Sequence, residues 1–349
     1  MNIAITGGGT GGHLSIAKAI GEELKSRGHN LIYIGSINGQ DKLWFKDSNI
    51  FNQCYFLESS GVVNKKGMKM LHSIYLQCKA IFKCIEIFKK HKINKTLSVG
   101  GYSAGGAAFA SILCFRPLFI HEQNAVLGSL NKLLAPFAKY IFCSFDINYK
   151  NLKKTPYPIN SIFFNESRER SEIKCILFLG GSQGARAIND FALLVAKTLI
   201  SKNIKIIHQC GEGDFQRVKN KYMQLNLMDE NGNSPYVELF DFDKNLVSKI
   251  TKADFCVSRA GASSMWELCA NGLPAYYIPY PYAAKNHQYF NAMHLKNMNL
   301  AEVKKQNELN ENDFFSYIES SNINHISKSI VKLNKNDGAK QIAALIESK

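Results

Sequence analysis

The apolar and polar positions of this chain alternate between short runs of β-forming residues and longer segments with a helical period. Five runs in the first half are predicted as strands: Asn2–Thr6, Leu31–Ile34, Thr96–Val99, Leu118–His121 and Tyr140–Cys143. Five more follow in the second half: Cys175–Leu179, Lys205–His208, Val237–Phe240, Asp254–Val257 and Ala275–Ile278. Helical segments between most of these strands predict parallel sheets with helices on both faces, which is an α/β architecture.

A polar stretch over residues 148–174 interrupts this alternation and contains Pro156, Pro158 and many charged residues. After it, the sequence CILFLGGSQGARAIND repeats the order at the N-terminus, namely a strand, a glycine turn and a helix. We therefore predict two doubly wound, Rossmann-like domains, residues 1–160 and 161–336, with this stretch as the linker. Sequence alone does not assign the last helix, expected at Ala339–Ile346, to either domain.

Glycine-rich turns follow four of the predicted strands: GGGTGGH at 7–13, GGYSAGG at 100–106, GGSQGA at 180–185 and SRAGAS at 258–263. In a parallel α/β sheet such turns lie at the carboxyl edge, where ligands bind. Each turn leads into a helix whose first N–H groups are unpaired and whose dipole favours negative charge. A single turn of this kind is often only a tight connection. Four turns, two in each half, favour a phosphate-bearing ligand.

A dinucleotide site is the first alternative, because Gly7, Gly9 and Gly12 satisfy the pattern GxGxxG. A nicotinamide site also needs an acidic residue at the end of the second strand to hold the ribose. That strand ends in YIGS, without a carboxylate. A Walker loop is excluded as well, because Gly12 is followed by His-Leu and not by Lys-Ser or Lys-Thr.

Composition and charge narrow the possible partners. The 349 residues are 46% hydrophobic, which suits two folded domains. The net charge of +15 favours an anionic partner, such as nucleic acid, a phosphate-bearing substrate or an acidic membrane surface. The nine cysteines are scattered and form no CxxC pair, so we expect a reducing cytosol and no disulfide framework or zinc site.

Other features of the sequence bear on location and metal binding. The N-terminus lacks the basic and apolar segments of a signal peptide. The longest weakly polar run, residues 104–115, is too short to span a bilayer. We see no metal site with credible ligand spacing, so we expect no tightly bound metal ion.

Six motifs occur in a fixed order: GGGTGGH, GGY, PLFIHEQNAVLGSLNKLLA (117–135), GGSQGA, SRAGASSMWEL (258–268) and NHQYFNA (286–292). In this combination the chain resembles glycosyltransferase family 28, the bacterial N-acetylglucosaminyltransferases that complete the lipid-linked precursor of peptidoglycan. The resemblance implies the glycosyltransferase B fold, with two doubly wound domains facing each other across a cleft. It assigns the acceptor and the membrane to domain 1–160 and UDP-GlcNAc to domain 161–336. It also implies that the C-terminal helix, residues 337–349, packs back on the first domain.

The reaction implied by the resemblance is an inverting transfer of GlcNAc from UDP-GlcNAc. The acceptor is the 4-hydroxyl of undecaprenyl-diphosphoryl-N-acetylmuramoyl-pentapeptide, at the cytoplasmic face of the cell membrane. Such a transfer needs a base for the hydroxyl, stabilisation of the departing diphosphate and a dry cleft. The candidate catalytic bases are His13, whose side-chain type titrates near neutrality, and Glu122, whose pKa burial can raise. The sequence leaves the choice between them open.

The resemblance also implies which residues bind the donor, and no cofactor besides this donor substrate is expected. Ser182 would hold the departing diphosphate, and the Ala262 N–H group would lie near the sugar. Glu267 would accept both ribose hydroxyls, since a carboxylate suits two donors. Backbone near Phe240 would read the uracil, while Asn124, His287 and Gln288 would hold the GlcNAc hydroxyls. The complete predicted donor set is Thr10, Gly11, Gly12, Asn124, Ser182, Gln183, Phe240, Gly261, Ala262, Ser263, Glu267, His287 and Gln288.

Two positions depart from the family pattern. Residues 104–106 read AGG where the family commonly has Ser-Gly-Pro, which leaves Ser103 as the candidate for a hydroxyl contact to the acceptor. The family's linker motif Asn-Pro-Val-Arg reads YPIN at 157–160, so the arginine expected to pair with the UDP phosphate is missing. Arg168 and Arg170 are the candidate replacements.

The segment 63–95 contains nine lysines and one glutamate. On a helical wheel, one narrow stripe holds His72, Lys79, Lys83 and Lys90. The broad opposite face holds Leu71, Ile74, Tyr75, Cys78, Ile81, Phe82 and Ile85. An ordinary amphipathic helix would pack this apolar face on the sheet and leave its lysines in solvent. Because the implied acceptor is carried by a membrane lipid, we also expect peripheral, salt-sensitive binding to an anionic membrane through this segment, with Leu71, Tyr75, Lys79 and Lys83 among the contacts.

Three other functions fit parts of the sequence. A UDP-sugar-dependent diacylglycerol glycosyltransferase would share the fold and the nucleotide side and differ in its acceptor. A UDP-GlcNAc epimerase would share the architecture and need no acceptor. A nucleic-acid-binding protein would suit the charge, but the lysines are concentrated in one amphipathic helix and no recognition motif is present, so we expect no nucleic-acid partner.

Overall fold

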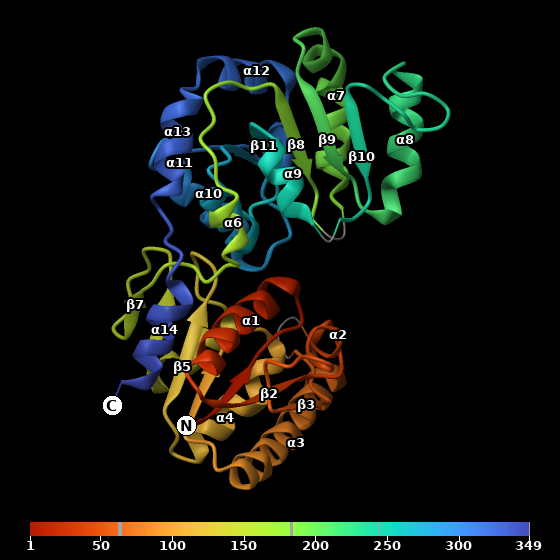
Figure 1. The fold of residues 1–349 in the computed structure, drawn as a ribbon. Coiled ribbons are helices and arrows are strands. Elements are labelled where there is room, and N and C mark those ends of the chain that lie inside the picture. The colour runs from red at the N-terminus through yellow and green to blue at the C-terminus, as the bar shows by residue number, and fades with distance from the viewer. Residues whose placement is uncertain (62–64, 182–183, 244, 349) are drawn as a thin grey trace. The chain divides into compact units, whose positions relative to one another are not determined.

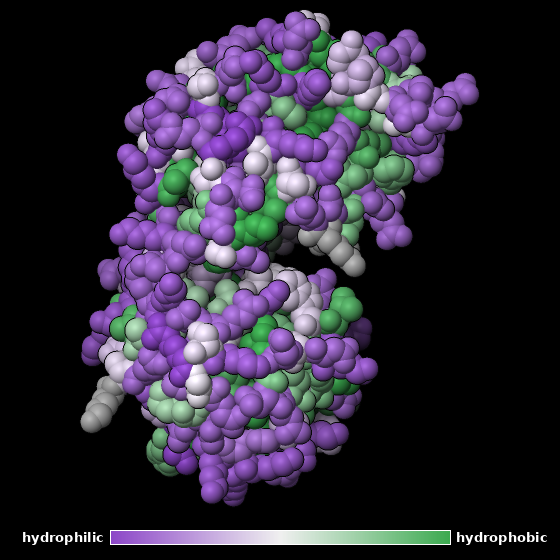
Figure 2. Space-filling view, viewed as in Figure 1, coloured by the Kyte–Doolittle hydropathy of each residue, from purple (hydrophilic) through white to green (hydrophobic). Residues whose placement is uncertain are grey.

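The computed structural model describes residues 1–349 except 62–64, 182–183, 244 and 349. The chain forms two compact units, one of Met1–Ile159 with Asn336–Lys349 and the other of Asn160–Lys335. Each unit is built on one parallel sheet covered by helices (Figure 1). The predicted α/β architecture with two doubly wound, Rossmann-like domains is confirmed. Hydrophilic residues cover most of the face of each unit that Figure 2 shows.

The first unit has a seven-stranded sheet in the order β3-β2-β1-β4-β5-β6-β7, with every pairing parallel. Its strands are β1 (Asn2–Thr6), β2 (Asn30–Ser36), β3 (Gln53–Leu57), β4 (Lys95–Ser98), β5 (Leu118–Glu122), β6 (Ala138–Cys143) and β7 (Leu152–Lys154). Its α-helices are α1 (Gly11–Ser26), α2 (Asp41–Phe45), α3 (Met68–His91), α4 (Gly105–Leu113), α5 (Ser129–Leu134) and α14 (Gly338–Glu347). Short 3-10 helices occupy η1 (Tyr102–Ala104) and η2 (Ala135–Phe137).

The second unit has a six-stranded parallel sheet in the order β10-β9-β8-β11-β12-β13. Its strands are β8 (Cys175–Leu179), β9 (Lys205–Gln209), β10 (Val237–Phe240), β11 (Phe255–Ser258), β12 (Ala275–Tyr277) and β13 (Glu302–Val303). Its α-helices are α6 (Ile162–Asn165), α7 (Arg186–Ser201), α8 (Phe215–Gln224), α9 (Leu246–Lys252), α10 (Ala262–Asn271), α11 (His287–Lys296), α12 (Glu311–Ser320) and α13 (Ile323–Val331). Its 3-10 helices are η3 (Glu212–Asp214), η4 (Ala284–Asn286) and η5 (Gln306–Glu308).

All ten predicted strands are present, with ends that differ by at most a few residues. The sequence pattern missed β3, β7 and β13, which lie at or next to the sheet edges. Strand β7 lies inside the stretch predicted as the linker and pairs with β6, so the linker prediction was too long at its N-terminal end. Helix α6 falls within the same stretch and belongs to the second unit.

The strand order reverses at one place in each sheet, and this place defines where a ligand is expected. In the first unit the reversal lies between β1 and β4, and in the second between β8 and β11. Ligands of doubly wound sheets bind at the carboxyl ends of the strands beside such a reversal. The four glycine turns follow these four strands. The topology therefore brings two glycine turns together in each unit.

Helix α14 returns the end of the chain to the first unit, where it packs along α1. Arg27 Nη1 and His29 Nε2 lie 2.9 Å and 2.7 Å from the Glu347 carboxylate. Lys95 Nζ donates to the carbonyl of Ser348 at 3.1 Å. At the other end of the helix, a Cβ on Gly338 would lie 2.4 Å from the Pro156 carbonyl oxygen, so only glycine allows this approach.

Helix α3 packs on α4 through a face that the helical wheel did not indicate. Its buried residues are Ser73, Leu76, Ala80, Cys84, Ile87 and Phe88. The contact is close, since a Cβ on Gly106 of α4 would lie 3.0 Å from the Ala80 Cβ. By contrast, Leu71, Tyr75 and Phe82 are 57%, 61% and 70% exposed. The expectation that the broad apolar face packs on the sheet therefore holds only in part: Ile81 and Ile85 are partly buried against the core, whereas Leu71, Tyr75 and Phe82 are exposed.

Two further observations concern the chain as a whole. All nine cysteines are free thiols. Among the residues that the structure describes, no helix combines the length and the apolar composition needed to cross a bilayer.

Candidate active site

The two glycine turns of the first unit are in close backbone contact with each other. The Gly8 N–H group donates to the Gly100 carbonyl at 3.1 Å. A Cβ on Gly101 would lie 2.2 Å from the Gly8 oxygen, and a Cβ on Gly7 would lie 2.4 Å from the Gly100 oxygen. Contact between two backbone segments thus explains these glycines without a ligand.

A buried carboxylate lies beneath the first of these turns. Asp41 is 0% exposed and accepts hydrogen bonds from the N–H groups of Gly9 at 2.7 Å and Ser36 at 3.0 Å. The Tyr33 hydroxyl lies 3.2 Å from the same carboxylate and donates to the Gly7 carbonyl at 2.8 Å. Sequence reasoning missed Asp41, whose only signal is an acidic residue soon after a strand. Asp41 fixes the backbone that leads to His13.

His13 lies in the first turn of α1 and is held at both ring nitrogens. Its Nδ1 lies 2.8 Å from the Thr10 hydroxyl, and its Nε2 lies 2.8 Å from the Gln123 carboxamide nitrogen. Thr10 is the N-cap residue of α1, but its side chain makes no capping hydrogen bond to the helix backbone. The Thr10 hydroxyl therefore orients His13, and the N–H groups of Gly11 and Gly12 begin the helix without a side-chain cap.

Glu122, at the end of β5, is 2% exposed and surrounded by donors from the loop that follows it. It accepts hydrogen bonds from the N–H groups of Asn124 at 3.0 Å and Gly128 at 2.8 Å. The carboxamides of Asn131 at 2.8 Å and Asn124 at 3.4 Å also donate to it. Burial raises the pKa of Glu122, and these hydrogen bonds oppose the rise. The carboxylate thus organises the 122–131 loop, including the predicted sugar contact Asn124.

His121, next to Glu122 on β5, has no role predicted from the sequence, and the structure places it close enough to His13 for their charges to interact. It is 0% exposed, and neither ring nitrogen has a partner among the described residues. Burial, with a smaller contribution from the charge of His13, lowers the pKa of His121 to about 3. The ring packs edge-on against Tyr157, with centroids 5.8 Å apart. His121 therefore remains neutral at physiological pH.

In the second unit, the predicted diphosphate contacts Ser182 and Gln183 lie outside the described residues. The neighbouring glycines differ from those of the first unit. A Cβ on Gly181 or on Gly261 would meet no atom within 4 Å. Gly261 is the N-cap of α10 with φ −65°, a backbone that any residue adopts. Neither packing nor backbone conformation requires glycine at 261, so the position has room for an approaching ligand. Ala262 and Ser263 begin α10 beside this open space.

Glu267 lies in the second turn of α10 and is partly buried. Burial alone raises the pKa of its carboxyl group to about 7. A partly buried carboxyl group that forms no ion pair with any described residue is suited to receive hydrogen-bond donors from a ligand. This fits the predicted contact with the ribose hydroxyls.

The remaining donor-binding candidates lie at the start of α11 and at the end of β10. His287 opens α11, and its Nδ1 lies 2.9 Å from the Ala284 carbonyl, so Nδ1 donates and Nε2 is the acceptor. Gln288 Oε1 accepts from the Tyr280 N–H group at 2.9 Å, which fixes its carboxamide. The Phe240 carbonyl, at the end of β10, accepts from the Cys210 N–H group at 3.0 Å.

Three residues are the predicted replacements for groups that the family has and this chain lacks: Arg168 and Arg170 for the linker arginine, and Ser103 for a hydroxyl contact to the acceptor. Arg170 is 1% exposed and donates to the Ala253 and Ile250 carbonyls at 3.2 Å and 3.1 Å. Arg168 donates to the Thr251 carbonyl and to Asp254, both at 2.6 Å. Ser103 is 4% exposed and points its hydroxyl into the protein. The expectations for Arg170 and Ser103 are therefore wrong, because both side chains are buried within their own units, while Arg168 is partly exposed and paired with Asp254.

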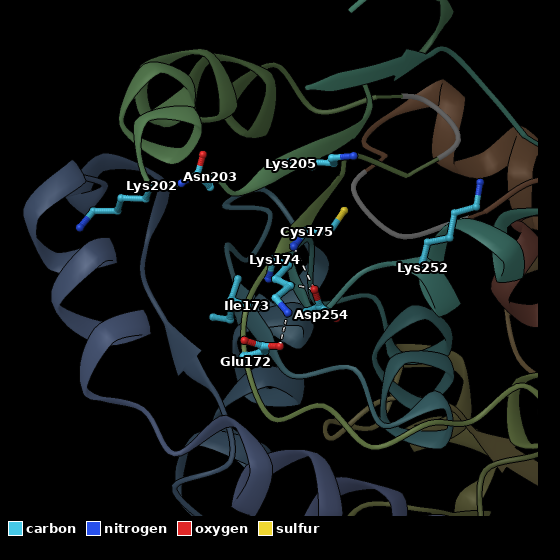
Figure 3. Close-up of a pocket in the computed structure, with 9 residues that line it drawn as sticks. All are labelled: Glu172, Ile173, Lys174, Cys175, Lys202, Asn203, Lys205, Lys252 and Asp254. Atoms are coloured by element: carbon cyan, nitrogen blue, oxygen red, sulfur yellow. Dashed lines mark hydrogen bonds and ion pairs between the residues drawn. The ribbon is translucent and has the colours of Figure 1, made fainter. Parts of the chain in front are cut away.

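A hollow of about 590 Å³ lies at the opposite, amino-terminal edge of the second sheet (Figure 3). Its lining contains four lysines, and the complete set is Glu172, Ile173, Lys174, Cys175, Lys202, Asn203, Lys205, Lys252 and Asp254. Asp254 accepts from the N–H groups of Lys174 and Cys175, both at 2.9 Å. This hollow is separate from the glycine turns, which lie at the carboxyl edge. Within the described ranges, no three His, Cys, Asp or Glu side chains gather closely enough to hold a metal ion.

Comparison with known families identifies the class of protein that this fold and these turns define. The N-terminal domain of glycosyltransferase family 28 matches residues 3–143, and the C-terminal domain of the same family matches residues 175–346. The chain therefore belongs to glycosyltransferase family 28.

Several relatives share one specific name, UDP-N-acetylglucosamine–N-acetylmuramyl-(pentapeptide) pyrophosphoryl-undecaprenol N-acetylglucosamine transferase. The Helicobacter hepaticus protein of this name is 49% identical over 353 residues, which span 99% of this chain and 98% of the relative. Those of Helicobacter acinonychis and Helicobacter pylori are each 50% identical over 358 residues, which span the whole of both chains.

Solved structures confirm the fold at lower sequence identity. MurG of Acinetobacter baumannii superposes with a TM-score of 0.81 at 24% identity, covering 99% of each chain. A putative UDP-N-acetylglucosamine 2-epimerase of Listeria monocytogenes has a TM-score of 0.67 at 10% identity, covering 99% of this chain and 95% of its own. Transferases and epimerases thus share the glycosyltransferase B architecture, so the fold alone does not distinguish the two activities. The distinction rests on the sequence identity to the named transferases.

Proposed function

We propose that this chain transfers GlcNAc from UDP-GlcNAc to the 4-hydroxyl of an undecaprenyl-diphosphoryl-N-acetylmuramoyl-pentapeptide, with inversion at the sugar. The observation that carries this proposal is identity of about one residue in two over the full length of relatives named for that reaction. The test is transfer of radiolabelled GlcNAc from UDP-GlcNAc to a short-chain analogue of the lipid acceptor. Absence of a labelled lipid product would contradict the proposal.

The donor is assigned to the second unit, at the reversal between β8 and β11. Two features of the described residues support this assignment: the open backbone at Gly261 and the carboxyl group of Glu267. The first N–H groups of α10 point toward the open end of the helix, where an anion is favoured. Ser182 and Gln183 complete the predicted diphosphate contacts, and His287 with Gln288 the sugar contacts.

The acceptor base is assigned to His13 and not to Glu122. The Glu122 carboxylate is occupied by donors from Asn124, Gly128 and Asn131, which it needs to shape its loop. His13 is partly exposed, and the Thr10 hydroxyl and the Gln123 carboxamide that contact its ring nitrogens are both neutral. Its side-chain type also titrates near the pH at which a general base is most efficient.

The proposed reaction is a direct displacement of UDP at the anomeric carbon of GlcNAc. His13 removes the proton from the acceptor hydroxyl, and the oxygen forms a bond to the anomeric carbon of GlcNAc. The bond from that carbon to the UDP oxygen breaks on the opposite side, and UDP leaves with the electron pair. N–H groups at helix ends stabilise the negative charge that develops on the leaving group. The proposal includes no tightly bound metal ion, so transfer should survive EDTA.

The pH dependence of two variants separates the candidate bases. His13→Asn should lower kcat by at least about a hundredfold and remove the acidic limb of the pH–rate profile. Glu122→Gln should lower kcat through its disturbed loop but keep that limb. An acidic limb that persists in His13→Asn and disappears in Glu122→Gln would assign the base to Glu122 instead.

We also infer that the chain binds an anionic membrane surface from the cytoplasmic side, through exposed apolar residues and lysines of α3. We define this α3 surface as Leu71, Ile74, Tyr75, Phe82, Lys79 and Lys83. The four apolar residues are between 41% and 70% exposed, which is unusual for a cluster on one helix. The lysines attract acidic headgroups at about 1 kcal/mol each. Lys79 and Lys83 also pair with Glu58 and Glu86, respectively, at the surface.

Sedimentation with vesicles containing anionic lipid tests this surface. Charge reversal at Lys79, Lys83 and Lys90 should abolish binding at low salt. The matched control reverses Lys202, Lys205 and Lys252, the exposed lysines around the hollow of the second unit. Equal loss of binding in both triple variants would show that only total charge matters and would contradict a role for α3.

The shared architecture makes a UDP-GlcNAc epimerase the second candidate function. An epimerase would convert UDP-GlcNAc without any acceptor, whereas the proposed transferase releases UDP only when the lipid is present. Nuclear magnetic resonance of UDP-GlcNAc incubated with the protein alone distinguishes the two. Replacing the muramoyl lipid by diacylglycerol in the radiolabel assay tests the remaining transferase alternative.

A further inference from the structure

The contact between Gln123 and His13 indicates which ring nitrogen of His13 carries a proton. The Gln123 carboxamide nitrogen lies 2.8 Å from His13 Nε2. In this orientation of the amide its nitrogen donates, so Nε2 accepts and carries no proton. The remaining ring proton is then on Nδ1, which donates to the Thr10 hydroxyl 2.8 Å away. The observed arrangement therefore matches one state of the ring, the neutral imidazole protonated at Nδ1.

This arrangement is incompatible with a protonated ring. An imidazolium donates from both nitrogens, so its Nε2–H would face the NH₂ group of Gln123, another donor. Rotation of the carboxamide by half a turn removes the conflict, because the carbonyl oxygen then accepts from Nε2–H. Two orientations of one amide thus match the two protonation states of His13.

We propose that Gln123 is a positioning residue whose carboxamide reverses when His13 takes a proton from the acceptor hydroxyl. This proposal rests on His13 being the base. With its NH₂ end toward the ring, Gln123 keeps Nε2 free of a proton before the reaction. With its oxygen toward the ring, it holds the imidazolium until the proton passes to solvent. The incoming hydroxyl replaces the NH₂ group at Nε2.

Among the described neighbours of His13, Gln123 is the partner that can adjust. On β5, His121 is neutral and buried, and the Glu122 carboxylate faces Asn124, Gly128 and Asn131. On the turn after β4, Gly100 lies against the ring without a side chain, since a Cβ there would be 3.3 Å from His13 Nε2. Thr10, the partner of Nδ1 on the ring's own helix, suits both states because a hydroxyl oxygen accepts from Nδ1–H in each.

Titration of His13 in the whole protein tests the proposal directly. The chain is labelled with ¹⁵N-histidine, and the His13 signals are assigned by their loss in His13→Asn. Gln123→Glu supplies an acceptor and a negative charge but no donor, so it should raise the His13 pKa by about one unit or more. Gln53→Glu adds the same charge at an exposed position on β3 and should leave the titration unchanged. A His13 titration in Gln123→Glu that coincides with that of the unaltered protein would overturn the proposal.

Kinetics provide the second measurement. Gln123→Met has a side chain of similar length that neither donates nor accepts strongly, so it should lower kcat by about tenfold with little change in KM for UDP-GlcNAc. An unchanged kcat would also overturn the proposal. Failure of the proposed base is distinguishable, because His13→Asn would then keep its rate while the effect of Gln123→Glu on the His13 titration persisted.

Discussion

The Asp41 carboxylate accepts a hydrogen bond from the Gly9 N–H group at 2.7 Å, so a residue of α2 fixes the turn that precedes His13. The same carboxylate serves the Ser36 N–H group and the Tyr33 hydroxyl and is 0% exposed. Removal of this buried acceptor affects stability more than a single hydrogen bond suggests, because the N–H groups of Gly9 and Ser36 both lose their partner, whereas the Tyr33 hydroxyl still donates to the Gly7 carbonyl.

Asp41→Ala should therefore lower the free energy of unfolding of the first unit by at least about 2 kcal/mol. It should also lower kcat, because the turn before His13 loses its anchor. Urea denaturation followed by tryptophan fluorescence measures the first effect, with Trp44 next to the site. Asp47→Ala removes an exposed carboxylate near the same helix and should change neither quantity. Equal stabilities of the two variants would contradict the anchoring role of Asp41.

The glycines at 101 and 261 should respond in opposite ways to a methyl group. Gly101 has φ +80°, and its Cβ would lie 2.2 Å from the Gly8 oxygen, so Gly101→Ala should cost more than about 1 kcal/mol of stability. Gly261→Ala meets no atom and should change stability by less than about 1 kcal/mol in either direction. Because the added methyl enters the space assigned to the donor, Gly261→Ala should weaken UDP-GlcNAc binding in calorimetry. Undiminished affinity would place the donor elsewhere.

The donor affinity should depend on the protonation of Glu267. Its pKa of about 7 means that the carboxylate, which can accept both ribose hydroxyls, predominates only above that pH. Below it, the dissociation constant for UDP-GlcNAc should rise by up to about tenfold per pH unit. UDP-GlcNAc is the suitable ligand because its diphosphate is fully esterified and does not titrate in this range. In Glu267→Gln the affinity should be lower and independent of pH. A pH dependence that persists in this variant would exclude Glu267 as its source.

The attachment of α14 should weaken in acid. Hydrogen bonding to His29 and Arg27 lowers the pKa of Glu347 below its ordinary value of 4.5. A carboxyl group whose pKa is lower in the folded state stabilises that state at neutral pH and loses this effect as the pH falls through the lowered pKa. The pair is partly exposed, so the contribution is at most about 1 kcal/mol. Hydrogen exchange over residues 338–347 should be faster in Glu347→Gln than in the unaltered protein at pH 7, and the two should converge in acid.

Much of the fold could be predicted because apolar runs mark the central strands of both sheets. The strands that the sequence did not reveal, such as β7 with its sequence LKK, lie at an edge and need no apolar run. The packing of α3 was only partly predictable from hydrophobicity, since Ile81 and Ile85 contact the core and Leu71, Tyr75 and Phe82 do not. Its contact with α4 depends on close approach between Ala80 and Gly106, and a wheel of apolar residues does not measure side-chain size.

The site was predictable only where a motif marks it. The turns, His13 and Glu122 lie in recognisable motifs, and the topology brings those of each unit together at one sheet edge. Asp41 and the state of His13 depend on distances between loops that are far apart in sequence, such as the 2.8 Å from Gln123 to His13. The interlocking of Gly8 and Gly101 likewise changes the interpretation of the first turn, from a ligand-driven feature to one that backbone contact explains.

The return of α14 to the first unit limits which fragments of this protein can fold on their own. A fragment that stops at residue 159 would leave the side of α1 that faces α14 exposed to water, and Lys95 would lose its carbonyl partners. An independently folding first unit must therefore carry residues 336–349 joined behind residue 159, so that two stretches distant in the gene are produced as one polypeptide.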